Sequence, residues 1–91
     1  MAVVRIPRQS VPTSAKVLLP SLTLMYLEIC NDTDAPIKFG AWDADGLCVI
    51  PNQDVQARGV LTYEAKFGNL VFGLQWKASA QGLVGWAQGE I

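Results

Sequence analysis

The chain has 91 residues, of which 51% are hydrophobic and 16% are charged, and its net charge at pH 7 is −1. This length supports one domain with a single core, and the near-zero charge gives no general attraction to nucleic acid. The longest apolar stretch, residues 17–27, is interrupted by Pro20 and is shorter than the roughly 18 residues of a membrane span. Since an average soluble domain carries about 25% charged residues, the low charge favours a surface partly covered by protein partners.

Residues 1–20 form a segment whose composition differs from the rest of the chain. Pro7, Pro12 and Pro20 exclude a helix interior or an uninterrupted ladder of strand hydrogen bonds, and each proline favours extended geometry in the residue before it. The charged side chains of this segment are all basic: Arg5, Arg8 and Lys16. We therefore predict an extended N-terminal arm over residues 1–20, attached to a β-rich body over residues 21–91.

The body alternates between apolar and polar residues over short stretches, which is the pattern of half-buried strands. Turn-forming residues separate these stretches, and residues 51–59 are expected to form a polar loop. The predicted strands span residues 22–30, 36–42, 47–50, 60–67, 70–78 and 83–91. This pattern predicts an all-β fold, a small antiparallel β-sandwich or barrel of about six strands. We expect this body to fold without residues 1–16.

The clearest alternation occurs in residues 60–78. One apolar set shares a face of the first stretch and another shares a face of the second: Leu61, Tyr63, Ala65 and Phe67, then Leu70, Phe72, Leu74, Trp76 and Ala78. Gly68 and Asn69 between the two stretches suit a tight type II′ turn, whose first central residue has a positive φ. We therefore expect a β-hairpin whose apolar face, including Trp76, packs in the core.

The sequence contains no histidine, which excludes histidine-dependent catalysis and histidine metal ligation. Glu28 and Glu64 could form the carboxylate pair of a glycoside hydrolase. Glu64, however, shares the outward face of its predicted strand with Lys66, which is typical of solvated surface. We therefore expect no enzymatic activity and no cofactor.

Cysteines and aspartates are the remaining candidates for disulfide or metal chemistry. Cys30 and Cys48 lie on different predicted strands, and no secretory signal is evident, so we expect two buried free thiols rather than a disulfide. Four aspartates in two predicted turns offer the oxygen ligands that calcium prefers: Asp32, Asp34, Asp43 and Asp45. Ordinary turn chemistry accounts for the same residues, and the bidentate glutamate of a calcium loop is missing downstream, so they form a weak calcium candidate only.

The first strand of the body and two tryptophans supply candidate contact residues. The stretch 22–30 is apolar on both faces near its start, which favours a covering partner. Tryptophan is enriched at the energetic centres of interfaces, and it also stacks on sugars. The candidate interface residues of the body are Leu22, Leu24, Tyr26, Trp42 and Trp86.

The predicted arm supplies a second set of contact residues. Its apolar side chains would hold a neighbouring subunit, and its basic side chains would attract an acidic surface. The candidate interface residues of the arm are Val3, Val4, Arg5, Ile6, Arg8, Lys16, Val17, Leu18 and Leu19.

In organisation the chain resembles the small head decoration, or cement, proteins of tailed phages. The resemblance rests on the arm around Pro7, Pro12 and Pro20, on the β body from Leu22 to Ile91, and on the low charge. It implies a structural subunit of the virion, made in the host cytoplasm, that docks on the major capsid protein. It also implies a homo-oligomer, with a trimer favoured. From the charge and the apolar stretches we expect no nucleic-acid or membrane partner. Two alternatives are a tail, collar or baseplate component and a β-sandwich module that binds carbohydrate or lipid.

Overall fold

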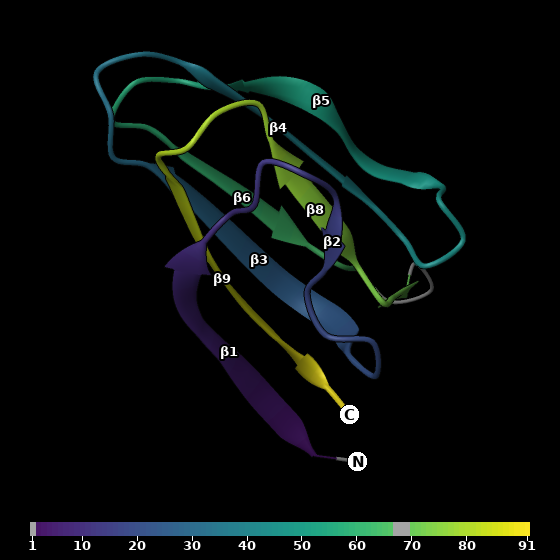
Figure 1. The fold of residues 1–91 in the computed structure, drawn as a ribbon. Helices are drawn as coiled ribbons and strands as arrows, with labels where there is room; N and C mark the ends of the chain where they lie inside the picture. The colour runs from purple at the N-terminus through teal and green to yellow at the C-terminus, as the bar shows by residue number, and fades with distance from the viewer. Residues whose placement is uncertain (1, 67–69) are drawn as a thin grey trace.

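The computed structural model describes residues 2–66 and 70–91. These residues form nine strands joined by turns, and no helix long and apolar enough to cross a membrane occurs among them. The strands make two antiparallel sheets that face each other as a small β-sandwich (Figure 1). The predicted all-β antiparallel fold is confirmed, in its sandwich form.

The first sheet contains, in spatial order, β1 (Val3–Ser10), β9 (Leu83–Glu90), β3 (Thr23–Asn31) and β6 (Val60–Glu64), and β7 (Val71–Phe72) also pairs with β3. The second sheet contains β2 (Lys16–Val17), β8 (Gln75–Ala78), β4 (Ile37–Trp42) and β5 (Cys48–Val55) in that order. Apart from β4 and β5, paired strands are distant in the sequence, so the sandwich depends on long-range pairing, above all on β9 between β1 and β3.

The core lies between the two sheets and is built from the inward half of each alternating strand. From the first sheet, β3 contributes Leu27 and Ile29 to the core. From the second sheet, Phe39 on β4 meets Trp76 on β8 edge to face, with the ring centroids 6.5 Å apart. The prediction that Trp76 belongs to the core is confirmed, because its side chain is 2% exposed.

The hairpin predicted over residues 60–78 does not form. Instead, β6 pairs with β3 in the first sheet, whereas β8 pairs with β4 and β2 in the second. The predicted turn at Gly68 and Asn69 lies outside the described residues. Alternation reports which face of a strand is buried but not which strand lies beside it, so two consecutive strands were wrongly assigned to each other.

At Gly73, the alternation of buried and exposed residues in the stretch 70–78 is shifted by one position. Gly73 has a φ of +59°, a conformation that glycine adopts without steric cost. Before it, Val71 is buried and Phe72 is 55% exposed, the reverse of the predicted faces. After it, Leu74 and Trp76 point inward as predicted.

The segment predicted to be a separate arm is part of the sandwich. β1 is extended, as expected from its prolines, but it runs antiparallel to β9 from the Val3–Glu90 pair to the Ser10–Val84 pair. The register shifts between Ile6 and Gln9, around Pro7, and such an irregular edge position tolerates a residue without an N–H group. The predicted boundary at residue 20 therefore does not divide the fold.

Two further contacts tie the N-terminal segment to the body. Val11, directly after β1, is 3% exposed in the core, and its backbone N–H donates to the Leu83 carbonyl at 2.9 Å. The two chain ends are also joined, because the Ala2 and Ile91 backbones exchange hydrogen bonds of 3.2 and 3.0 Å, and both ends lie side by side in Figure 1.

The loop predicted over residues 51–59 is shorter than expected. Residues 51–55 continue β5, which pairs with β4 from Val55 opposite Ile37 to Cys48 opposite Trp42. Pro51 fits within β5 because β5 is an edge strand whose pairing shifts register twice, and prolines occur in such strands.

Candidate functional site

The outer face of the first sheet carries four side chains that contact one another. They come from three neighbouring strands and are called here the aromatic cluster: Arg5 on β1, Tyr26 and Glu28 on β3, and Trp86 on β9. Trp86 lies directly opposite Glu28 in the β9–β3 pair. Since its neighbour Ala87 is fully buried and successive strand residues point to opposite faces, Trp86 points away from the core.

The geometry of the aromatic cluster is set by its mutual contacts. The Trp86 and Tyr26 ring centroids are 5.1 Å apart with the planes tilted by 45°, and the Arg5 guanidinium carbon lies 4.4 Å from the Trp86 ring centroid, within cation–π range. Trp86 Nε1 donates to Glu28 Oε2 at 2.6 Å, and the Tyr26 hydroxyl donates to Glu28 Oε1 at 3.5 Å. One carboxylate therefore orients both rings.

The surroundings of Tyr26 change its acidity. Partial burial raises the pKa of the Tyr26 hydroxyl, and the negative charge of Glu28, its hydrogen bond to Tyr26 and the charge of Glu64 raise the pKa further. Because the ordinary tyrosine pKa is about 10, Tyr26 stays protonated at neutral pH and remains a hydrogen-bond donor to Glu28.

Replacing Glu28 with glutamine should lower the pKa of Tyr26, because the nearest negative charge opposing its ionisation is lost. The decrease should be partial, since partial burial, the larger cause, remains. The pKa can be measured from phenolate absorbance during alkaline titration of a variant that also carries Tyr63→Phe, so that Tyr26 is the one remaining tyrosine. Glu64→Gln should lower the pKa less. A Tyr26 pKa that does not respond to Glu28→Gln would contradict the contact.

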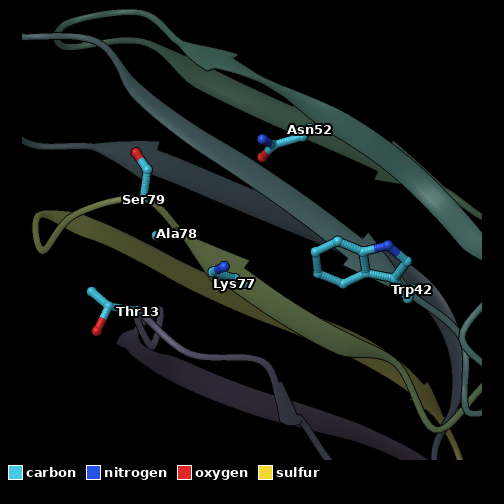
Figure 2. Close-up of a pocket in the computed structure, with 6 residues that line it drawn as sticks. All are labelled: Thr13, Trp42, Asn52, Lys77, Ala78 and Ser79. Carbon is cyan, nitrogen blue, oxygen red and sulfur yellow. The ribbon is translucent and has the colours of Figure 1, made fainter.

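The outer face of the second sheet contains a trough of about 410 Å³ (Figure 2). Its lining residues come from β4, β5, β8 and the adjoining loops: Thr13, Trp42, Asn52, Lys77, Ala78 and Ser79. Figure 2 shows the Trp42 indole at one end of the trough, Thr13 and Ser79 at the other, and Lys77 between them. The trough thus combines an aromatic surface with several hydrogen-bonding groups and one cation.

A glycine in β4 forms part of the floor beneath the indole. Gly40 lies opposite Lys77 in the β4–β8 pair. A Cβ atom at Gly40 would lie 3.2 Å from Cη2 of Trp42 and 3.4 Å from Oδ1 of Asn52. Because glycine has no side chain, the Trp42 ring and the Asn52 amide both reach close to the β4 backbone, and the half-buried indole is held against the sheet.

Two of the predicted contact residues of the body are not on a surface. Leu22 and Leu24 are buried in the core, whereas Tyr26 and Trp86 belong to the aromatic cluster and Trp42 lines the trough. The register of β3 against β9 shifts between Leu24 and Tyr26. Simple alternation places Tyr26 on the same face as the two leucines, but this bulge turns Tyr26 outward while the leucines stay in the core. The prediction that Leu22 and Leu24 contact a partner was therefore wrong.

The predicted contact residues of the arm divide into two groups. Four of them pack against the core and are partly buried: Val4, Ile6, Leu18 and Leu19. The other five are exposed: Val3, Arg5, Arg8, Lys16 and Val17. The inward side chains of β1 and of the residues after β2 are therefore used within the fold. Of the exposed residues, Val3 and Arg5 lie on β1 of the first sheet, and Lys16 and Val17 form β2 of the second sheet.

The four aspartates proposed for calcium are not brought together. Asp34 binds Arg58 with an N–O distance of 2.9 Å at one end of β4, and at the other end Asp43 Oδ1 accepts hydrogen bonds from the Asp45 and Leu47 backbone N–H groups. Within residues 2–66 and 70–91, no group of three acidic, cysteine or histidine side chains could hold a metal. Asp43 therefore stabilises a turn, and Asp34 forms an ion pair with Arg58.

The two cysteines are free thiols on different sheets. Cys30 on β3 is half-buried, whereas Cys48 at the start of β5 is exposed. The prediction of burial is therefore wrong for Cys48, because it follows a turn and begins an edge strand.

Several residues of the two surfaces were not predicted from the sequence. Glu28 was considered only as a catalytic acid, and its contact with Trp86 depends on the register of two strands that are far apart in the chain. Asn52 was assigned to a loop. The outward position of Lys77 could have been predicted, because it follows the core residue Trp76 and successive strand residues point to opposite faces.

Comparisons with known proteins give likenesses of fold only. No family model and no curated protein matches the chain. A chain of the structure described as "Bacillus endospore appendages form a novel family of disulfide-linked pili" is similar, with a TM-score of 0.53 and 10% identity, covering 98% of this chain and 88% of that one. At that identity the likeness shows the fold alone.

Two further solved structures are similar at a TM-score of 0.48. One is PirA, with 12% identity over 96% of this chain and 91% of that one. The other is the coat protein of Tobacco streak virus, with 11% identity over 98% of this chain and 85% of that one. Both are too distant to support an inference about function.

Proposed function

We propose that this protein is a non-enzymatic structural subunit of a larger assembly and that it docks on its neighbour through the outer face of the first sheet. The aromatic cluster is the observation that carries the proposal. Tryptophan, tyrosine and arginine are the residue types most enriched where interfaces gain their binding energy. Here Arg5, Tyr26 and Trp86 occur together on one sheet face.

The aromatic cluster is arranged before any partner binds. Its contacts already hold the side chains of Arg5, Tyr26 and Trp86, so less conformational entropy is lost on docking. The Trp86 N–H group is already bonded to Glu28, so covering the indole with an apolar surface leaves no unpaired donor. Both properties favour a protein partner over exposure to solvent.

Apolar side chains extend this face beyond the aromatic cluster. Val60 on β6 lies opposite Cys30 on β3, which in turn lies opposite Val84 on β9. Val60 is 59% exposed, and Val3, at the far end of β1, is 60% exposed. The sheet face thus has a central group of aromatic and arginine side chains, next to polar side chains of β6 and β9 and with exposed valines further out. An interface has a similar division between its centre and its polar rim.

The two longest edge strands are less suited to assembly than the sheet face. The two eight-residue edge strands, β1 and β5, contain Pro7 and Pro51, and both pair with shifted register. Prolines and bulges on edge strands hinder the addition of a further strand. We therefore assign docking to side chains on the sheet face rather than to the backbone at an edge.

Within this role, we place the protein in a virion, as a decoration protein that binds the major capsid protein as a homo-oligomer, with a trimer favoured. The low charged fraction supports a surface that is partly covered. The likeness to a chain of the Bacillus appendage structure supports the use of this fold in a subunit of an assembly. Because β1 is part of the first sheet, we assign docking to the face that includes β1 and not to a free N-terminal arm.

The proposal is tested by two matched tryptophan truncations. Trp86→Ala should weaken binding of the purified protein to particles that lack it by about 2 kcal/mol or more, roughly 30-fold in affinity. Trp42→Ala, an equal truncation on the opposite sheet, should leave binding unchanged. Affinity is measured by co-sedimentation with the particles, and circular dichroism verifies that both variants fold. Full binding by Trp86→Ala, or equal losses in both variants, would contradict docking through this face.

A further inference from the structure

We propose that the trough on the second sheet binds a saccharide that carries a carboxylate group. The trough and the aromatic cluster lie on opposite outer faces of the sandwich. Binding of a saccharide is therefore independent of the assembly role, and each can fail without the other.

The size and the aromatic end of the trough suit a sugar ring. Its volume of about 410 Å³ lies within the range of small-molecule sites, about 300–1,000 Å³. The Trp42 indole provides a flat surface on which the C–H face of a pyranose can stack. Gly40 lets this indole lie against the sheet, so the stacking surface is positioned before the ligand arrives.

The polar lining suits sugar hydroxyl groups rather than an acyl chain. The Asn52 amide can both donate and accept hydrogen bonds. The Ser79 hydroxyl oxygen accepts a hydrogen bond from the Lys38 backbone N–H at 3.0 Å, which fixes the oxygen and leaves the O–H free to donate. Thr13 adds a second hydroxyl. Among the lining residues, Ala78 is fully buried in the core, so Trp42 is the one hydrophobic side chain that a ligand could contact, too little to cover a lipid tail.

The charge of the trough indicates an acidic sugar. In residues 2–66 and 70–91, ion pairs join Lys38 to Asp54 at 3.2 Å and Arg58 to Asp34 at 2.9 Å, and neither involves Lys77. The Lys77 ammonium therefore makes no ion pair with a carboxylate of these residues, and Figure 2 shows Lys77 between the indole and the hydroxyl groups. A single carboxylate on a stacked sugar ring would complement it.

The test uses oligosaccharides of galacturonate, glucuronate and sialate, each compared with its neutral methyl ester. Binding is followed by the NMR signal of the Trp42 indole N–H and by calorimetry. At least one acidic sugar should shift this signal and bind about tenfold or more tightly than its ester. Trp42→Ala should abolish binding, and Lys77→Met should reduce the affinity for the acid to that for the ester. Trp86→Ala is the matched control and should bind normally.

Three results would overturn the proposal. If none of the acidic sugars shifts the Trp42 signal at millimolar concentration, the trough is not a saccharide site. If acid and ester bind equally and Lys77→Met has no effect, no carboxylate is recognised. If an acidic peptide shifts the Trp42 signal and none of the sugars does, the trough belongs to a protein contact. A loss of particle binding in Trp86→Ala concerns the assembly role alone and leaves these results unaffected.

Discussion

Deleting residues 2–11 should destabilise the protein so strongly that much of it is unfolded at room temperature. The deletion removes β1, the partner of β9, and it removes Val11 from the core. Val4 and Ile6 also lose their contacts with the core. Together these apolar groups account for about 4 kcal/mol or more, a large share of the total stability of a domain this small, about 5–15 kcal/mol.

The deletion is checked by circular dichroism and by urea unfolding. The expected result is loss of the β spectrum or a broad transition at low urea concentration. Val3→Ser serves as the control, because this side chain is 60% exposed at the start of β1, and it should have little effect. A truncated protein with an unchanged spectrum and a sharp transition would show that the N-terminal segment is a dispensable arm after all.

Trp76→Ala should lower the free energy of unfolding by about 3–5 kcal/mol, the usual cost of truncating a large buried aromatic. The ring fills the space between the sheets, where it contacts Phe39 and lies over Gly85. A Cβ atom at Gly85 would be only 2.7 Å from the indole, so little room remains there for repacking.

The loss in Trp76→Ala is measured by urea unfolding against Trp42→Ala, in which a half-buried indole is removed from the outer face of the second sheet. The Trp42 variant should lose clearly less stability. A loss of less than about 1 kcal/mol for Trp76→Ala would contradict the assignment of this residue to the core, since such a value is typical of surface substitutions.

Much of the fold could be predicted because burial imposes a period of two on each strand. On β4 the buried residues are Ile37, Phe39 and Ala41, which follow this period, and Trp76 on β8 was assigned correctly to the core. Pairing could not be predicted in the same way. The partners of β6 and β8 are set by contacts across the whole chain, and alternation in one strand says nothing about its neighbour.

Local irregularities account for the remaining errors. The positive φ of Gly73 and the bulge between Leu24 and Tyr26 each reverse the faces that strict alternation assigns. In the candidate site, Tyr26 and Trp86 could be singled out by residue type. Their contact with Arg5 could not, because it depends on the order β1-β9-β3, in which the first and last strands of the chain are neighbours.

In the assembled protein the outer face of the first sheet should be buried, and side-chain footprinting measures this burial at individual tryptophans. Hydroxyl radicals oxidise exposed tryptophans, and mass spectrometry measures the extent of oxidation at each tryptophan. In the isolated protein, the half-buried Trp86 and Trp42 should both be oxidised, and the core Trp76 should be protected. In the assembled particle, Trp86 should become protected while Trp42 stays reactive. Equal oxidation of Trp86 in the free and assembled protein would contradict docking through this face.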